Sequence, residues 1–158
     1  MTMGGIEDWS AVAADDADRI LTVLGPLAQQ MVVRDEALWP IGVGVRPDGQ
    51  IEPLSVSPEG LESTQEALEF LIEMMIINRD SWRTVCVAIA IDLPNCDGAL
   101  QFNVENIDGH SIALIMRYRA SKLLQTMIFD EFTYVEIPPM IWGFNPDEIA
   151  SDSLNEDT

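Results

Sequence analysis

The chain has 158 residues, about the length of one domain, and carries 27 acidic against 8 basic residues, a formal net charge of −19. Hydrophobic residues make up 47% of the chain, which is enough for a buried core, so the acidity does not imply disorder. The acid excess repels phosphate backbones and argues against nucleic acid as a partner. No apolar run reaches the roughly 18 residues that span a bilayer, and no signal-like stretch follows the N-terminus. We therefore expect a soluble, cytoplasmic bacterial protein with no membrane partner.

The acidic residues are concentrated at both ends of the chain. Residues 1–18 and 145–158 each hold five acids and no base. Because the last stretch also has almost no apolar content, we expect a single domain over 1–144, followed by a flexible acidic tail over 145–158. The charge has two interpretations, which are solubility alone or a surface that attracts a basic partner through long-range electrostatics.

The first 60 residues predict a helix followed by a β-hairpin. Apolar residues at helical spacing indicate a helix over 10–33, with a kink or a break at Gly25-Pro26. Two strands, over 38–45 and 50–56, flank the turn Arg46-Pro47-Asp48-Gly49. Gly42 and Gly44 lie inside the first strand, where we expect close backbone packing or a bulge.

The rest of the chain predicts a second helix and a set of antiparallel strands. Ser63 and Glu66 form a capping box at the start of a helix over 63–78. The segment 84–92 is apolar on both faces, as in a central strand covered on both sides. Further strands are expected over 99–106, 111–119 and 131–137, with a loop or a short helix at 120–128.

This order of elements predicts an α+β domain. It consists of an N-terminal helix, a β-hairpin, a second helix and then three to four antiparallel strands. All strands belong to one mostly antiparallel sheet, and we expect the helices on one face of it.

The middle of the chain resembles a family of small bacterial α+β proteins. The resemblance covers roughly residues 37–142 and rests on an aromatic-x-Pro-x-Gly strand, here Leu38-Trp39-Pro40-Ile41-Gly42, and on strand ends and turns. The other matching segments are Asp48-Gly49, Val87–Asp92, Phe102–Glu105, Asp108-Gly109 and Met116-Arg117-Tyr118. Arg117 departs from the pattern, which has Pro before the Tyr. Proteins of this kind look like immunity or accessory partners of toxins, and the resemblance implies fold more than activity and no catalytic residues.

The residues that usually carry catalysis are scarce. His110 is the only histidine and follows a hairpin turn, so we expect a surface residue. Cys86 lies in a buried strand and Cys96 in a turn, and these three side chains fall short of the four ligands of a structural zinc site. Chance pairs of acids could hold Mg²⁺ or Ca²⁺, but no EF-hand spacing is present. We expect no catalytic residue, no metal and no cofactor.

The apolar segment 138–144 follows the last strand. Such a segment either packs back as a lid on the core or presents Trp142 as an interface anchor, since aromatic residues dominate binding hot spots.

The sequence favours a non-catalytic acidic binding protein, an immunity-type inhibitor that occludes the active site of a basic toxin or effector. Four glutamates, the first just before the second helix, recur at spacings of four, three and four and form one stripe. Other candidates lie near strand ends. The predicted partner-binding residues are Glu62, Glu66, Glu69, Glu73, Asp92, Asp97, Glu105, Asp108, Asp130, Glu131 and Trp142.

Two alternatives from other classes stay open. The first is a small-ligand-binding or enzymatic domain whose pocket is lined by carboxylates. The second is a self-associating module, which would show an apolar patch on the half-exposed face of the sheet. The sequence leaves open whether the protein is a monomer or a homodimer.

Overall fold

A computed structural model describes residues 9–35, 37–57 and 59–143 of the chain. The predicted tail at 145–158 lies outside these residues. The described part forms one antiparallel sheet of seven strands with two α-helices, so the α+β prediction is confirmed. Five strands follow the second helix, where the sequence predicted three to four. The helices and strands are α1 (Ala11–Asp35), β1 (Ile41–Val45), β2 (Ile51–Ser55), α2 (Thr64–Ile77), the 3₁₀ helix η1 (Arg79–Ser81), β3 (Thr84–Ile91), β4 (Gly98–Asn106), β5 (Ser111–Ser121), β6 (Thr126–Phe129) and β7 (Thr133–Glu136).

The strand order in the sheet is β2-β1-β3-β4-β5-β6, and β7 also pairs with β5. β6 pairs with Tyr118–Ser121, and β7 pairs with Ile112–Ile115. Because β4 occupies the other edge of β5, β6 and β7 follow each other along the same edge. The segment expected as a loop or short helix at 120–128 is therefore the end of β5, a tight turn and β6.

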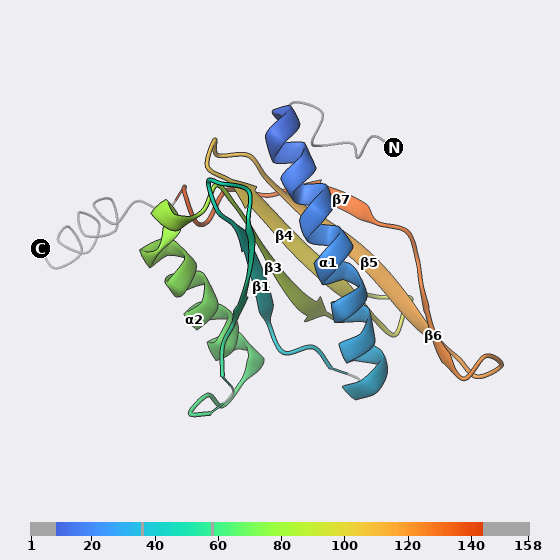
Figure 1. Cartoon of the computed structure of the whole chain (residues 1–158). Helices are drawn as coiled ribbons and strands as arrows, with labels where there is room; N and C mark the ends of the chain where they lie inside the picture. Colours follow the sequence, from blue (N-terminus) through green and yellow to red (C-terminus); the bar gives the residue numbers. More distant parts are fainter. Residues whose placement is uncertain (1–8, 36, 58, 144–158) are drawn as a thin grey trace, which may run out of the picture.

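The two helices cover opposite faces of the sheet, which corrects the prediction that both lie on one face (Figure 1). Cys86 and Ala88 of β3 belong to the core beneath α1, whereas Val85 and Val87 belong to the core beneath α2. Alternate residues of a strand point to opposite faces, so this central strand is apolar on both. Its composition therefore required a cover on each side.

α1 is a single helix of 25 residues that passes through Gly25-Pro26. Pro26 is on the exposed face of the helix, and Thr22, the residue whose carbonyl loses its amide partner at position 26, is exposed as well, so the helix continues without a break. Alanines in the buried stripe bring this helix close to the sheet. The buried residues of α1 are Ala13, Asp16, Ala17, Ile20, Leu21, Leu24, Gly25, Ala28 and Val32.

α2 begins as the sequence predicts. The Ser63 side chain accepts a hydrogen bond from the Glu66 amide at 3.2 Å, and the Glu66 carboxylate accepts one from the Glu62 amide at 2.7 Å. Ala67, Leu71 and Met75 are fully buried against the sheet. This packing stabilises a helix whose row of like charges would otherwise weaken it.

Two glycines in β1 allow α2 and Trp82 to approach the sheet, as expected for close packing. A Cβ atom at Gly42 would lie 2.7 Å from the terminal methyl of Met75, and one at Gly44 would lie 2.5 Å from Cδ1 of Trp82.

We therefore expect G44A to lower the free energy of unfolding by about 2 kcal/mol through overpacking against the indole. Urea unfolding measures this change. The control is G25A, because a Cβ atom at Gly25 meets open space, and this variant should leave stability unchanged or raise it. G109A does not serve as a control, because Gly109 has a φ of +89°, which strains any other residue.

Candidate functional site

The outward face of α2 carries an exposed acidic stripe, which we define as Glu66, Glu69 and Glu73 of the helix and Glu62 just before it, with the neighbouring Phe70 and Ile77. All four glutamates are exposed, and α2 contains no Lys or Arg. Phe70 is 47% exposed and Ile77 is 80% exposed. The stripe thus combines an uninterrupted row of carboxylates with two large apolar side chains, two helical turns apart, that the fold leaves uncovered.

The glutamates of the acidic stripe keep their charge available. Four ion pairs form among the described residues, and none of them includes a glutamate of the acidic stripe. Glu66 is partly engaged by the capping box, and Glu69 accepts a hydrogen bond from the Gln65 amide group at 3.2 Å. Neither contact neutralises a carboxylate. The stripe therefore produces a negative potential that attracts cationic groups from a distance.

Asp92 and Asp97 lie together at the end of the sheet where β3 ends and β4 begins. They line a pocket of about 440 Å³ with Thr64 and Gln65 from the first turn of α2, and with Tyr118 from β5. Its apolar wall comes from Leu38, Pro40, Leu68 and Ile91, among others. This strand-end pocket adjoins the start of the acidic stripe, because both involve the first turn of α2.

The remaining predicted acids do not join this group. Asp108 is exposed in the turn after β4, which is the end of the sheet opposite to Asp92 and Asp97 because β3 and β4 are antiparallel. Asp130 and Glu131 are exposed between β6 and β7, and the Asp130 amide donates to the Arg117 carbonyl. The predicted acids therefore form one coherent surface at α2, a neighbouring pair in the pocket and separate single sites elsewhere.

Glu105 is a buried structural carboxylate, in contrast to its expected place on a half-exposed strand face. Its side chain is buried, and its oxygens accept hydrogen bonds from the amides of Met140, Ile141 and Trp142 at 2.6 to 3.0 Å. The carboxylate thereby anchors the segment after β7 to the sheet. These contacts occupy the group, so we leave Glu105 out of the proposed binding surface.

Trp142 belongs to the same anchored segment, which packs back on the core beneath α2. Ile141 is buried there, and Trp142 is partly buried against the same cluster. Arg79 donates a hydrogen bond to the Ile141 carbonyl at 3.0 Å. Of the two interpretations of this segment, the described residues 138–143 take the lid arrangement, and Trp142 is not presented as a free anchor.

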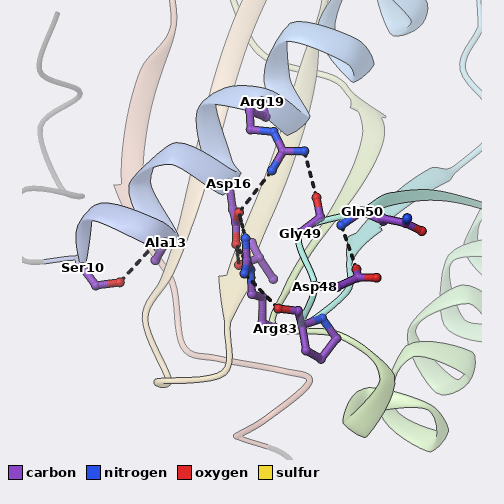
Figure 2. Close-up of polar contacts among 10 residues, drawn as sticks. Ser10, Ala13, Asp16, Arg19, Asp48, Gly49, Gln50 and Arg83 are labelled. Carbon is purple, nitrogen blue, oxygen red and sulfur yellow. Dashed lines mark hydrogen bonds and ion pairs between the residues drawn. The ribbon is translucent and has the colours of Figure 1, made fainter.

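A buried ion pair that the sequence did not single out connects α1 to the sheet (Figure 2). Asp16 is fully buried and accepts hydrogen bonds from the Arg83 guanidinium at 2.8 and 2.9 Å and from the Thr84 hydroxyl at 2.9 Å. Arg19 lies 3.7 Å from the same carboxylate and also donates to the Gly49 carbonyl. Asp16 raises the pKa of Arg83 above its ordinary value through its hydrogen bonds. An acid within the apolar stripe of a helix was the sequence signal for this contact.

The two cysteines and the single histidine contact other parts of the fold. Cys86 is fully buried, and burial raises the pKa of its thiol well above the usual range, so it stays protonated. Cys96 is partly exposed and donates to the Leu93 carbonyl. His110 is half-buried and stacks on Trp9 with ring centroids 5.9 Å apart. Within the described ranges, no three or more His, Cys, Asp or Glu side chains form a group that could hold a metal ion.

Comparison of the chain with protein-family models, with curated proteins and with solved structures finds no match. In the part of the chain that the structure describes, no helix is both long and apolar enough to cross a membrane.

Proposed function

We propose that the protein is a non-catalytic binding protein of the immunity type, which neutralises a basic toxin or effector in the cytoplasm by covering its active site. The observation that supports this most directly is the acidic stripe on α2, with four exposed carboxylates and no ion pair to them among the described residues. Enzymes that act on phosphates need a cationic active site. A row of carboxylates competes with a polyanionic substrate for such a site.

Phe70 and Ile77 give the proposed contact an apolar centre. Charged rims accelerate and orient encounters, whereas desolvated aromatic residues supply most of the affinity. Phe70 lies outside the buried face of α2, whose buried residues are Ala67, Leu71 and Met75, and it is 47% exposed. The partner surface that fits this stripe is a basic groove with an apolar pocket.

The first test compares capture of basic proteins from a lysate of the native host. The bait is the wild type or the triple variant E66Q/E69Q/E73Q, and each capture is made at low and at high salt. We expect a basic protein that the wild type retains at low salt and releases at high salt, and that the triple variant retains at least about tenfold less. Glutamine keeps the helix propensity and the cap at position 66, so the helix persists.

A matched variant controls for net charge. D15N/D18N/E136Q removes the same number of exposed acids from α1 and β7, away from the stripe. We expect this variant to retain the partner nearly as well as the wild type. Equal losses in the two triple variants would mean that net charge alone drives the association, and the proposal would fail. F70A tests the apolar centre, with an expected loss of tenfold or more.

The small-ligand alternative has one observation in its favour, which is the strand-end pocket. A concave site with an apolar wall and a few converging polar groups is typical of ligand-binding proteins. Asp92, Asp97 and Tyr118 provide the polar groups. This second candidate function is compatible with partner binding at α2, because the pocket adjoins only the start of the stripe and none of the stripe residues lines it.

A further inference from the structure

The strand-end pocket is lined by Tyr118, a largely buried residue whose hydroxyl forms no hydrogen bond within the described part of the chain. Tyr118 is only 8% exposed, and its ring contacts Phe129 with centroids 5.7 Å apart. A Cβ atom at Gly98 would collide with the Tyr118 hydroxyl, so the glycine makes room for it at the start of β4. Among residues 9–35, 37–57 and 59–143, no group forms a hydrogen bond with this hydroxyl. The hydroxyl is accessible from the pocket, so a polar group that enters the pocket can form a hydrogen bond with it.

The charge around this hydroxyl is negative. Asp92 and Asp97 line the same pocket, and neither takes part in any ion pair among the described residues. One oxygen of Asp97 accepts a hydrogen bond from the Ala120 amide at 2.6 Å, which fixes the position of its carboxylate. Burial, together with the nearby charges of Asp92, Cys96 and Asp97, raises the pKa of Tyr118, so its hydroxyl is neutral at physiological pH.

The walls of the pocket are apolar and its volume is modest. Leu38, Pro40, Leu68 and Ile91 contribute hydrocarbon surface, and the volume is about 440 Å³. That space accepts a short aliphatic chain with a polar head. It is too small for a folded partner element such as a helix, whose diameter is about 10 Å.

We propose that the strand-end pocket binds an organic cation, a primary ammonium or guanidinium group on a short aliphatic stem. Asp92 and Asp97 accept hydrogen bonds from its N–H groups, the Tyr118 oxygen accepts a third, and the apolar wall contacts the stem. An anion is disfavoured by the two carboxylates, although the pocket includes the first turn of α2. At that helix end the Ser63 hydroxyl already accepts a hydrogen bond from the Glu66 amide, so this amide is not available to bind an anion.

The cation has two possible sources, a free small molecule or a lysine or arginine side chain of a protein. We propose testing the full chain by two-dimensional amide NMR with agmatine as a free guanidinium and with the blocked peptide Gly-Arg-Gly as a side-chain source. The expected result is saturable shifts confined to amides near Ile91, Gly98 and Tyr118, with at least one probe. Binding of agmatine identifies a small-molecule site, and binding of the peptide alone identifies a site for a protein side chain.

Variants decide whether the shifts report the proposed contacts. We expect D97N and D92N each to weaken binding about tenfold, and Y118F to weaken it several-fold while the chain stays folded. D108N removes an exposed acid at the opposite end of the sheet and should leave the affinity unchanged. Absence of saturable shifts with both probes, or an equal loss in D108N, would overturn the proposal. The α2 variant E66Q/E69Q/E73Q should bind the probes as the wild type does, which separates this test from that of the proposed function.

Discussion

E105A is expected to lower the free energy of unfolding by about 4 kcal/mol, and E105Q by about 2 kcal/mol. The Glu105 carboxylate is buried and accepts hydrogen bonds from the amides of Met140, Ile141 and Trp142. Alanine leaves these donors unpaired in an apolar environment and releases a segment that covers the core beneath α2. Glutamine retains one acceptor oxygen but loses the charge, so its effect is smaller.

Urea unfolding followed by tryptophan fluorescence and by circular dichroism measures both changes. E136Q is the matched control, because Glu136 is exposed on β7, and it should change stability by less than about 0.5 kcal/mol. A variant E105A with wild-type stability would show that the carboxylate does not hold the segment after β7.

D16A is expected to cost about 3 kcal/mol of unfolding free energy. Asp16 is buried and forms a two-point contact with Arg83, so its removal leaves the guanidinium and the Thr84 hydroxyl without their partner. The side chain of Arg83 is 27% exposed, which allows partial solvation and keeps the cost below that of a fully buried cation.

The double variant D16L/R83M separates the charge from the packing. Replacing both members of a buried pair with apolar residues of similar volume often restores stability, so we expect the double variant to recover at least half of the loss. D15A, which changes the neighbouring exposed acid, is the control and should be nearly neutral. A loss in D15A as large as that in D16A would assign the effect to helix charge and not to the Asp16–Arg83 contact.

Local chemistry predicted the fold where one segment contains the whole signal. The capping box at Ser63 and Glu66 predicted the start of α2, and the alternation of Leu100, Phe102 and Val104 predicted the buried face of β4. The turn at Gly49 has the positive φ, +90°, that its glycine indicated. β6 was missed because the turn before it, Lys122-Leu123-Leu124-Gln125, has no Gly, Asn or Pro, and Gln125 takes a φ of +53°.

Features that depend on the third dimension were not predicted. The apolar composition of β3 on both faces required a cover on each side, yet sequence order does not show which helix crosses to which face. Alternation places Glu105 on the more polar face of β4, but its partners come from a segment more than 30 residues later. The four glutamates of the acidic stripe followed from helical spacing alone, whereas the meeting of Asp92, Asp97 and Tyr118 in one pocket depends on the arrangement of three strands.

The measurement that tests the proposed function most directly is amide hydrogen–deuterium exchange of the wild-type protein, alone and in complex with the captured basic partner. The account predicts slower exchange over residues 62–77, with the largest change around Phe70 and Glu73, and reversal of this protection at high salt. Protection confined to β6 and β7, with unchanged exchange along α2, would contradict the assignment of the acidic stripe as the binding surface.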